Sequence, residues 1–582
     1  MNVVHIELPR GFTFTVKEYL TEARTALESA AHSYRQYDAN PFFWRWLMQL
    51  STPHSPGDCL PPLLAPEPGE KTWAALAETA QHLRDISTLY GVKISLRGVE
   101  LPKAALDSTY AMCSLIADNY GCALFSGLFQ QLDERVHFSG ADLISIGCDY
   151  QEGVFWALNL AAWMRARGST AHLCIARHDH ENFSLLHHVE DLAKNEWFFG
   201  LVDSLILHDE ELPATLCQLA DALESGRIDA LENIAIKPKD GPPRIAPLHP
   251  AAAGEKRRAS PDYGIPPDYF SAMDVPAEHL VYSMGMVRNQ CFYRKCTFCV
   301  QITKHVSETA FEQTAEVERA VNACAELVKH GVRFVNFSDE AMRPVDLRRF
   351  SEAILARRIP VRWVGRMIAA AHPDEETLRL MHSAGCVEIL FGIESFDPTV
   401  LRGMGKISGR NDGPDETVAM IRSYTGAGMF VILSMIYDFP MENAAARETT
   451  RSLVARIADP ARMAFIFNRF ALFHTAAIFK EPERYGITGV EPRQPRNDIQ
   501  YVFAWQRESP ADAATADEAR IYQALKFAAC PDTYAALCEK HGAALLEMAY
   551  FLDYNSIGLT HRVRHNTTVL ASLLGREKAQ PV

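Results

Sequence analysis

The sequence has no excess of basic residues, no long apolar run and few cysteines for its length. Its 582 residues include 58 Lys and Arg against 72 Asp and Glu, which gives a formal net charge of -14. This balance disfavours a general electrostatic grip on nucleic acid or on anionic membranes. The N-terminus has no secretory signal pattern, and no uncharged apolar run is long enough to span a bilayer. These absences predict a cytoplasmic protein with no nucleic-acid or membrane partner.

Thirteen cysteines in 582 residues are too few for a disulfide scaffold, and ten of them are scattered singly. The other three, Cys291, Cys296 and Cys299, lie within nine residues. Thiolates bind iron, copper or zinc far better than they bind hard cations. Three cysteines that hold a 4Fe-4S cluster leave one iron open for another ligand. The same residues together with His305 would also suit a structural zinc knuckle, so spacing alone leaves both metals open.

Strand and helix patterns alternate in the second quarter of the chain, with strands at 142–147, 171–176 and 202–207 and a helix at 154–167. This alternation predicts a doubly wound, Rossmann-like α/β domain over residues 139–237, with ligands at the carboxyl ends of the strands. Cys148, Asp149 and Tyr150 follow one such strand and are candidate ligand contacts. Residues 1–138 carry helical patterns without an assignable role, and the proline-rich residues 238–276 predict a linker.

A second α/β pattern occupies residues 277–475. It predicts strands at 280–284, 334–337, 361–364, 387–391, 430–436 and 464–467, with helices between them. Six strand-helix units are too few for an eightfold barrel but suit a partial (β/α)6 barrel of the TIM type. The cysteines follow its first strand, at the end where such barrels bind ligands. Residues 476–582 predict a helical C-terminal region on the substrate side.

Several motifs in this second unit resemble those of the radical SAM superfamily. The cysteine loop has an aromatic residue, Phe298, before its last cysteine, and further motifs follow successive strands: Phe337-Ser-Asp-Glu340, Trp363-Val-Gly-Arg366, Gly385-Cys-Val-Glu-Ile-Leu-Phe-Gly-Ile-Glu-Ser395 and Leu401-Arg-Gly-Met-Gly-Lys406. A zinc knuckle would not predict this order of motifs. The resemblance therefore favours a 4Fe-4S cluster held by Cys291, Cys296 and Cys299.

The resemblance also implies roles for residues near the cluster. Asp339 and Glu340 are expected to meet the ammonium group of S-adenosylmethionine, and Arg366, Glu394 and Ser395 its carboxylate or ribose. Structural alternatives stay open for each of them. Asp339 or Glu340 would cap a helix, Arg366 would pair with Glu394, and Ser395 would be an N-cap.

The Rossmann-like unit resembles the cobalamin-binding domain that precedes the barrel in one class of radical SAM enzymes. The resemblance lies in the order of elements, in the strand start at Asp142 and in the exit from Asp203 to His208 and a helix; no Asp-x-His-x-x-Gly motif supplies an axial histidine. It implies cobalamin as a further cofactor, while a sheet that serves only as scaffold remains an alternative.

Together the resemblances imply an enzyme that cleaves S-adenosylmethionine to a 5'-deoxyadenosyl radical, which abstracts a substrate hydrogen. Cobalamin-dependent C-methylation of a peptide or natural-product precursor is the expected outcome, with an electron donor such as a flavodoxin or ferredoxin as partner. Radical cyclisation or rearrangement without methyl transfer, and a non-catalytic metal-binding relative, are the alternatives.

The sequence departs from the family pattern in two places. Its cysteines are spaced CxxxxCxxC, with one residue more than the usual CxxxCxxC. The segment Tyr437-Asp-Phe-Pro-Met-Glu442 stands where relatives often have Gly-Phe-Pro-Gly-Glu, so two glycines that would allow close backbone approach are replaced.

Overall fold

The computed structural model describes residues 1–522 with gaps at 12–14, 18, 55–69, 149, 178–183, 208–211, 248–276, 278–280, 288–290, 301–309, 408–412, 460–461 and 520–521. The predicted linker therefore lies mostly outside the described residues. So do Asp149, His305 and the two C-terminal helices that the sequence predicts at 514–529 and 531–549, apart from a few of their residues.

The first sheet has seven strands in the order β10-β9-β8-β7-β6-β1-β3. The pairs from β8 to β3 are parallel, whereas β9 and β10 pair in antiparallel fashion. Its strands are β1 (Asn2–Glu7), β3 (Ser33–Asp38), β6 (Leu143–Gly147), β7 (His172–Arg177), β8 (Ser204–Ile206), β9 (Ile234–Ile236) and β10 (Arg244–Ile245). This sheet confirms the predicted Rossmann-like fold, and we call it and its helices the Rossmann unit.

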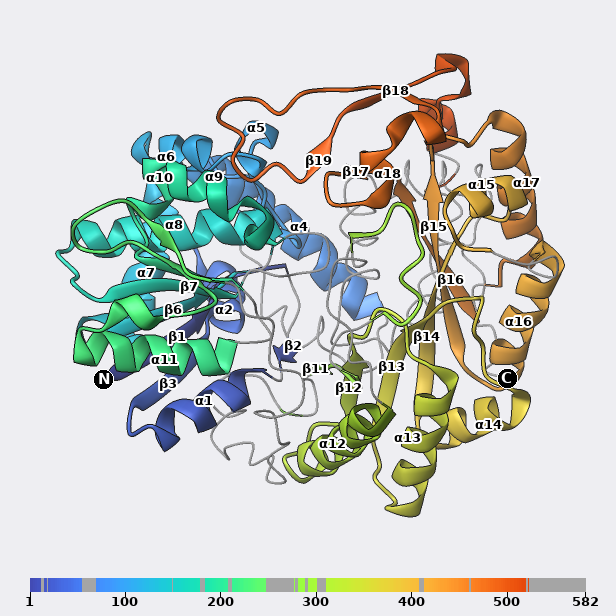
Figure 1. Ribbon diagram of the computed structural model, residues 1–582, viewed down its shortest axis with the longest axis horizontal. Helices are drawn as coiled ribbons and strands as arrows, with labels where there is room; N and C mark the ends of the chain where they lie inside the picture. Colours follow the sequence, from blue (N-terminus) through green and yellow to red (C-terminus); the bar gives the residue numbers. More distant parts are fainter. Residues whose placement is uncertain are drawn as a thin grey trace.

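Helices cover both faces of this sheet (Figure 1). On one face Ala23 and Leu27 of α1 (Tyr19–Ser29) share an apolar cluster with Leu216 and Leu219 of α11 (Leu212–Ser225). The helices of the other face and of its rim are α2 (Ala39–Gln49), α4 (Glu70–Tyr90), α5 (Lys103–Leu106), α6 (Thr109–Ala117), α7 (Cys122–Val136), α8 (Tyr150–Ala166), α9 (Val189–Lys194) and α10 (Glu196–Phe199).

The Rossmann unit begins earlier than the sequence boundary at residue 139 predicts. The first strand, β1, pairs with β6 and β3, so residues 1–138 supply two strands of the same sheet. The apolar run Val3 to Ile6 is buried, as expected for a central strand with both faces covered. The long, mostly helical segment between β3 and β6 separates these strands in sequence. Local sequence patterns therefore do not predict that they belong to one sheet.

The second sheet is entirely parallel, in the order β16-β15-β14-β13-β12-β11-β2. It confirms the predicted partial barrel through strands β11 (Val281–Met284), β12 (Phe334–Phe337), β13 (Arg362–Met367), β14 (Cys386–Glu394), β15 (Phe430–Tyr437) and β16 (Met463–Arg469). The helices between them are α12 (Ala310–Lys329), α13 (Pro344–Ala356), α14 (Glu375–Ser383), α15 (Pro398–Gly403), α16 (Pro414–Gly426) and α17 (Ala444–Ile457).

A strand from the N-terminal part of the chain completes the barrel sheet. β2 (Thr15–Lys17) lies between β1 and β3 in sequence but pairs with β11 at the edge of the barrel. In Figure 1, β1 begins at the outer side of the Rossmann unit and the chain then runs toward β2. The carboxyl ends of the parallel Rossmann strands therefore face the barrel.

The described part of the C-terminal region contains short strands as well as helical turns. After α18 (Ala477–Lys480) come β18 (Ile487–Val490), β19 (Val502–Phe503) and β20 (Trp505–Arg507); β19 pairs with β17 (Leu472–Phe473), and β18 pairs with β20. A further small hairpin joins β4 (Ile94–Ser95) to β5 (Gly98–Val99) near the Rossmann unit.

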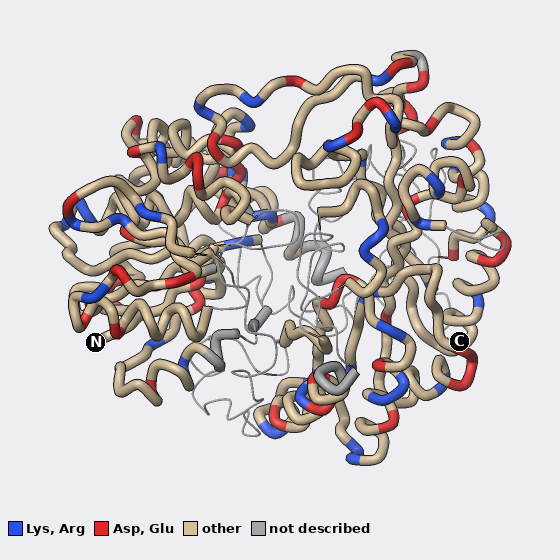
Figure 2. Tube along the Cα trace, viewed as in Figure 1, with Lys and Arg blue, Asp and Glu red and all other residues tan. Residues whose placement is uncertain are grey.

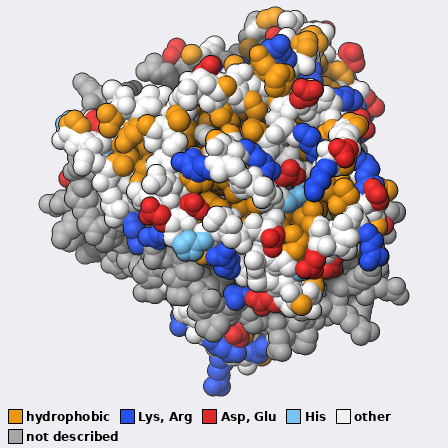
Figure 3. All heavy atoms as spheres, turned by 90° about the vertical axis from the view of Figure 1, so that its left-hand side faces the viewer, with side chains coloured by type: hydrophobic (Ala, Val, Ile, Leu, Met, Phe, Trp, Pro, Cys, Tyr) orange, Lys and Arg blue, Asp and Glu red, His pale blue; other side chains and the backbone are white. Residues whose placement is uncertain are grey.

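Charged residues of both signs are distributed along the chain (Figure 2). On the face of the Rossmann side, they are interspersed with apolar side chains (Figure 3). Within the described ranges, no helix combines the length and the apolar character needed to span a bilayer.

Candidate functional site

The cysteine loop lies at the carboxyl end of β11 and is held by the turn after α15. Cys291 forms an isolated parallel bridge with Ala341. The amide of Thr297 donates to the carbonyl of Met404 at 3.0 Å, and its hydroxyl donates to Gly403 O at 2.9 Å. The hydroxyl of Tyr293 donates to Gly405 O at 2.7 Å. These bonds fix the loop that carries Cys291, Cys296 and Cys299 against one turn of the barrel.

Gly405 must be a glycine for this contact to form. Its φ is +72°, and a Cβ added there would collide with the carbonyl of Lys295. A left-handed backbone and a close backbone approach both favour glycine.

The three cysteines form no disulfide and lie in a partly enclosed setting. Cys296 is buried, and Cys291 and Cys299 are half-buried. Burial raises the pKa of the Cys296 thiol, while the nearby Lys406 ammonium acts in the opposite direction. In the described chain no group of three His, Cys, Asp or Glu side chains is placed to hold a single metal ion. Three soft thiolate donors on one loop have the chemistry of a ligand set for a 4Fe-4S cluster with one iron open.

Lys406 is the charged residue that sequence reasoning missed. Its Nζ lies 3.1 Å from Glu394 Oε1, donates to Gly392 O at 2.9 Å and stands 5.8 Å from the ring centroid of Phe298. Burial opposes the charge, but Glu394 and the Cys296 and Cys299 thiols raise the pKa of Lys406. The ammonium therefore stays charged beside two cysteines. One sequence feature could have identified Lys406, because it is the last residue of the motif that follows the Gly385–Ser395 motif.

Asp339 and Glu340 point to different partners although they are adjacent. The buried Asp339 carboxylate accepts from the amides of Met286 at 2.5 Å and Val287 at 2.9 Å, at the start of the segment leading to the cysteines. Burial raises the pKa of Asp339 to about 6 against these hydrogen bonds. Arg319, also buried, donates to Gly285 O at 2.5 Å. Asp339 thus holds the backbone of the segment that leads into the cysteine loop.

Arg366 pairs with Glu340 rather than with Glu394. The two side chains approach to 3.3 Å between Nη1 and Oε2, both at the carboxyl edge of the sheet. Glu394 instead pairs with Lys406, and burial raises its pKa. Glu394 sits at a β-bulge of β14 with φ +69°, which turns its carboxylate toward the lysine.

Ser395 is buried and is not a helix N-cap. Its hydroxyl lies 3.1 Å from Thr450 Oγ1 and accepts from the amide of Asp397 at 3.1 Å. The N-cap of α15 is Asp397, which accepts from the amides of Thr399 and Val400. Ser395 therefore shapes the turn between β14 and α15.

A cavity opens beside the cysteine loop and Lys406. Its wall includes apolar side chains and a few polar ones, from the segment after β13, the end of β14 and the first turns of α16: Tyr293, Ile368, Ala369, Ala370, His372, Gly392, Ile393, Leu401, Lys406, Ile407, Glu416, Thr417 and Met420. A concave site that combines apolar side chains with a few convergent polar groups is typical of small-molecule binding.

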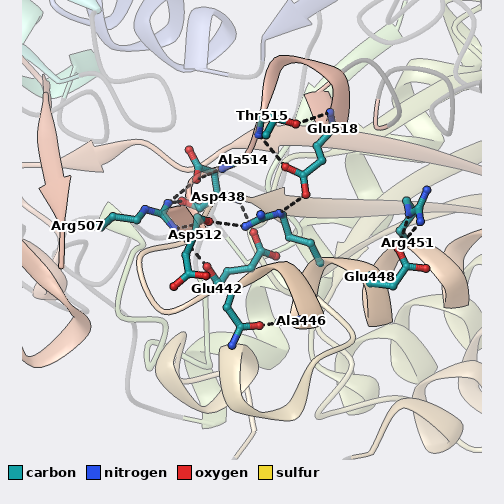
Figure 4. A network of polar contacts seen from close by, with 12 residues as sticks. Asp438, Glu442, Ala446, Glu448, Arg451, Arg507, Asp512, Ala514, Thr515 and Glu518 are labelled. Atoms are coloured by element: carbon teal, nitrogen blue, oxygen red, sulfur yellow. Dashed lines mark hydrogen bonds and ion pairs between the residues drawn. The ribbon is translucent and has the colours of Figure 1, made fainter. Parts of the chain in front are cut away.

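The segment that departs from the family pattern forms a polar network at the end of β15 (Figure 4). Asp438 replaces a glycine and keeps the left-handed backbone, with φ +64°. Its carboxylate pairs with Arg507 of β20 and with Arg469 at 2.8 Å, and it accepts from the amide of Ala514 at 3.0 Å. Asparagine and aspartate adopt the left-handed backbone conformation more readily than most other side chains do. The hydrogen bonds and ion pairs of the Asp438 carboxylate hold the backbone in this conformation, for which a glycine would otherwise be favoured.

Glu442 closes the same network. It is buried, and its Oε2 accepts from the amide of Asp438 at 2.5 Å. Burial raises its pKa to about 8, although Arg447 and Arg507 act in the opposite direction.

In the Rossmann unit, Cys148 is buried at the carboxyl end of β6, and Tyr150 begins α8. Gly147 lies beneath the Glu7 carboxylate, where a Cβ would collide with it. Glu7 contacts His5 at 3.0 Å, and the other ring nitrogen of His5 lies 2.7 Å from Ser145 Oγ. The described end of β6 thus consists of the small residues Gly147 and Cys148 beside a buried row of polar side chains.

Comparison with known proteins relates the barrel to one superfamily. Residues 287–454 match the model of the radical SAM superfamily. An uncharacterized methyltransferase of Pyrococcus horikoshii is 24% identical over 256 residues, which cover 43% of this chain and 52% of that protein. The match therefore spans about half the length of that curated relative.

Two solved structures share the fold of the whole chain. The radical S-adenosylmethionine methyltransferase TsrM from Kitasatospora setae, with cobalamin and a 4Fe-4S cluster bound, has a TM-score of 0.53 at 13% identity, over 99% of each chain. OxsB, a cobalamin-dependent radical enzyme with aqua-cobalamin and S-adenosylmethionine bound, has a TM-score of 0.55 at 10% identity, over 99% of this chain and 80% of that chain. The chain thus contains a radical SAM domain match over residues 287–454, and its overall fold is similar to that of these two solved structures.

Proposed function

We propose that this protein is a cobalamin-dependent radical SAM enzyme that methylates an unactivated carbon of a small molecule or peptide. The observation that carries the proposal is the cysteine loop at the carboxyl edge of the barrel, with the buried Lys406 beside Cys296 and Cys299. That edge lies next to a Rossmann unit whose parallel strands point toward the barrel (Figure 1).

The proposal gives a separate role to each group of residues near the cysteine loop. Cys291, Cys296 and Cys299 hold the 4Fe-4S cluster, and Asp339 fixes the start of their loop. When bound, the cluster supplies the electron that cleaves S-adenosylmethionine, and cobalamin supplies the methyl carrier. Lys406 keeps a positive charge beside the thiolates and so favours their ionised form.

The ion pair between Glu340 and Arg366 offers both signs of charge at the same strand ends. An amino acid moiety carries an ammonium and a carboxylate, so we assign this pair to the methionine end of S-adenosylmethionine. The cavity beside Lys406 and Tyr293 holds the rest of S-adenosylmethionine and the substrate. Its walls exclude water from the reactive radical. In the Rossmann unit, we assign cobalamin to the carboxyl end of β6, where Cys148 lies.

Reconstitution under anaerobic conditions tests the cofactor assignment. We expect about four irons with matching sulfide per chain, and one retained cobalamin with its visible spectrum. Incubation with trideuteromethyl S-adenosylmethionine, a flavodoxin or dithionite, and candidate peptides or small molecules should give 5'-deoxyadenosine and a labelled product. One zinc without sulfide would refute the radical reaction. A cluster-loaded protein that forms 5'-deoxyadenosine but binds no cobalamin would favour radical rearrangement without methyl transfer.

A further inference from the structure

A segment of the C-terminal region connects the barrel side to the Rossmann unit. Residues 491–503, which we call the strap, leave β18, cross to the Rossmann helices α6 and α9, and return to β19 (Figure 1). β19 then pairs with β17, which follows the last barrel strand. The strap is thus fixed at both ends to the barrel side, and its middle lies against the other unit.

Asp498 anchors the middle of the strap at the N-terminus of α6. Its side chain is buried and accepts from the amide of Thr109 at 2.7 Å, from the hydroxyl of the same residue, and from Asn195 Nδ2 at 3.2 Å. A carboxylate at a helix N-terminus satisfies backbone amides that have no partner within the helix and is favoured by the helix dipole.

Main-chain hydrogen bonds surround this anchor. The hydroxyl of Ser108 donates to Arg496 O at 2.6 Å, and the amide of Ile499 donates to Asp107 O at 3.1 Å. The guanidinium of Arg496 lies over the ring of Tyr110, 3.9 Å from its centroid. The strap therefore contacts the start of α6 on both sides of Asp498.

Arg493 forms a second anchor on another helix of the Rossmann unit. It pairs with Asp191 of α9, and its Nη2 lies 2.5 Å from Nδ1 of the buried His188. His188 also packs against Tyr501 of the strap, with ring centroids 4.5 Å apart. Two charged side chains of the strap thus engage two different Rossmann helices.

We propose that the strap sets the position of the Rossmann unit relative to the cysteine loop, and that Asp498 and Arg493 are positioning residues for methyl transfer. The inference rests on the proposed function. Units joined within one chain move relative to each other unless their interface is fixed. Cleavage of S-adenosylmethionine at the cluster needs only the barrel. Methyl transfer to cobalamin also needs the Rossmann unit to be held at the correct distance and orientation relative to the barrel.

The two reactions leave different products, which makes the coupling measurable without a known substrate. Transfer of the sulfonium methyl group to reduced cobalamin leaves S-adenosylhomocysteine. Reductive cleavage, with one electron from dithionite, leaves methionine and a 5'-deoxyadenosyl radical, which forms 5'-deoxyadenosine by taking a hydrogen atom from a buffer molecule when no substrate is present. Without a substrate each cobalamin accepts a single methyl group, so the ratio is taken from initial rates. This ratio of S-adenosylhomocysteine to 5'-deoxyadenosine in the cluster- and cobalamin-loaded protein reports how well the units are aligned.

The experiment compares Asp498→Ala, Asp498→Asn and Arg493→Met with Glu481→Gln. The control changes a carboxylate that pairs on the surface with Arg484, within the same C-terminal region. For Asp498→Ala and Arg493→Met we expect this ratio to fall about tenfold while 5'-deoxyadenosine formation stays within about twofold, since small misplacements of reacting groups have such effects. Asp498→Asn, which keeps an acceptor for Thr109, should lie in between, and the control should match the unchanged protein.

Hydrogen exchange at Thr109 and Ile499 supplies a readout that does not depend on activity. Faster exchange together with a lower product ratio supports the inference. Faster exchange with an unchanged ratio overturns it, and so does unchanged exchange in both anchor variants. If the unchanged protein forms neither product, the proposed function fails, and the exchange rates still decide whether Asp498 and Arg493 anchor the strap.

Discussion

At the scale of single residues, the site depends on a buried charge pair that the sequence did not indicate. Lys406 and Glu394 are each almost fully enclosed, with side chains 10% and 8% exposed. Removing one member of a buried ion pair leaves an uncompensated charge. This lowers the free energy of unfolding more than replacing both members with neutral residues does.

We therefore expect Lys406→Met to lower the free energy of unfolding of the cluster-free protein by about 3 to 5 kcal/mol, because Glu394 loses its partner. Chemical denaturation followed by circular dichroism measures this. The double variant Lys406→Met with Glu394→Gln should recover much of the loss. A double variant that is no more stable than Lys406→Met would contradict the account.

Glu442 predicts a pH dependence of stability. Its folded-state pKa is raised to about 8 from 4.5, so its favourable contribution is present below pH 4.5 and is lost as pH rises through 8. Glu442→Gln stays neutral and still accepts from the amide of Asp438. Its melting temperature relative to the unchanged protein should be similar near pH 5 and higher at pH 8.5, by the equivalent of a few kcal/mol. A difference that does not vary with pH would argue against a buried, destabilised carboxylate.

Particular residues show what the sequence could predict about the site. The motifs predict the cysteines, Arg366, Glu340 and Glu394 at neighbouring strand ends. The structure pairs Arg366 with Glu340, and it pairs Glu394 with Lys406 beside Cys296. Their pairing was not predictable, because the bulge that turns Glu394 toward Lys406 is a feature of the backbone between two strands. Asp339 and Ser395 likewise bond to backbone and hydroxyl groups that are distant in sequence.

At the scale of elements, the turn after α15 determines how the cysteine loop is held. Gly405→Ala would place a methyl group against the Lys295 carbonyl in a left-handed backbone. We expect this substitution to displace the loop and to reduce iron and sulfide content after reconstitution to well below half of the normal value, since strain at such a position costs about 1 to 3 kcal/mol. Gly426→Ala on α16, where a Cβ meets nothing, is the matched control. Equal iron content in both variants would show that the turn does not support the loop.

The elements also show why the domain plan was only partly visible in the sequence. Barrel strands and helices follow one another along the chain, so periodicity and glycine stops predict them well. Asp374, for example, is the N-cap of α14, and Glu375 and Glu376 follow in its first turn. The strands β1, β2 and β3 lie within 38 residues of the N-terminus, yet they divide between two sheets. Such non-local pairing leaves no local periodic signal.

At the scale of the whole molecule, the two sheets are linked in more than one place. β2 extends the barrel sheet from the N-terminal part of the chain, and the strap returns from the barrel side to the Rossmann helices. The fold thus turns the carboxyl ends of the parallel Rossmann strands toward the barrel that carries the three cysteines (Figure 1). We propose that this arrangement allows radical formation and methyl transfer in one chain.

The most direct measurement of the central claim is the formation of 5'-deoxyadenosine from S-adenosylmethionine by the anaerobically reconstituted, reduced protein. The account predicts that the unchanged protein, loaded with about four irons per chain, forms it, and that Cys296→Ala forms none above background. A cluster-loaded sample that leaves S-adenosylmethionine intact would contradict the account, because the three cysteines would then hold iron without generating a radical.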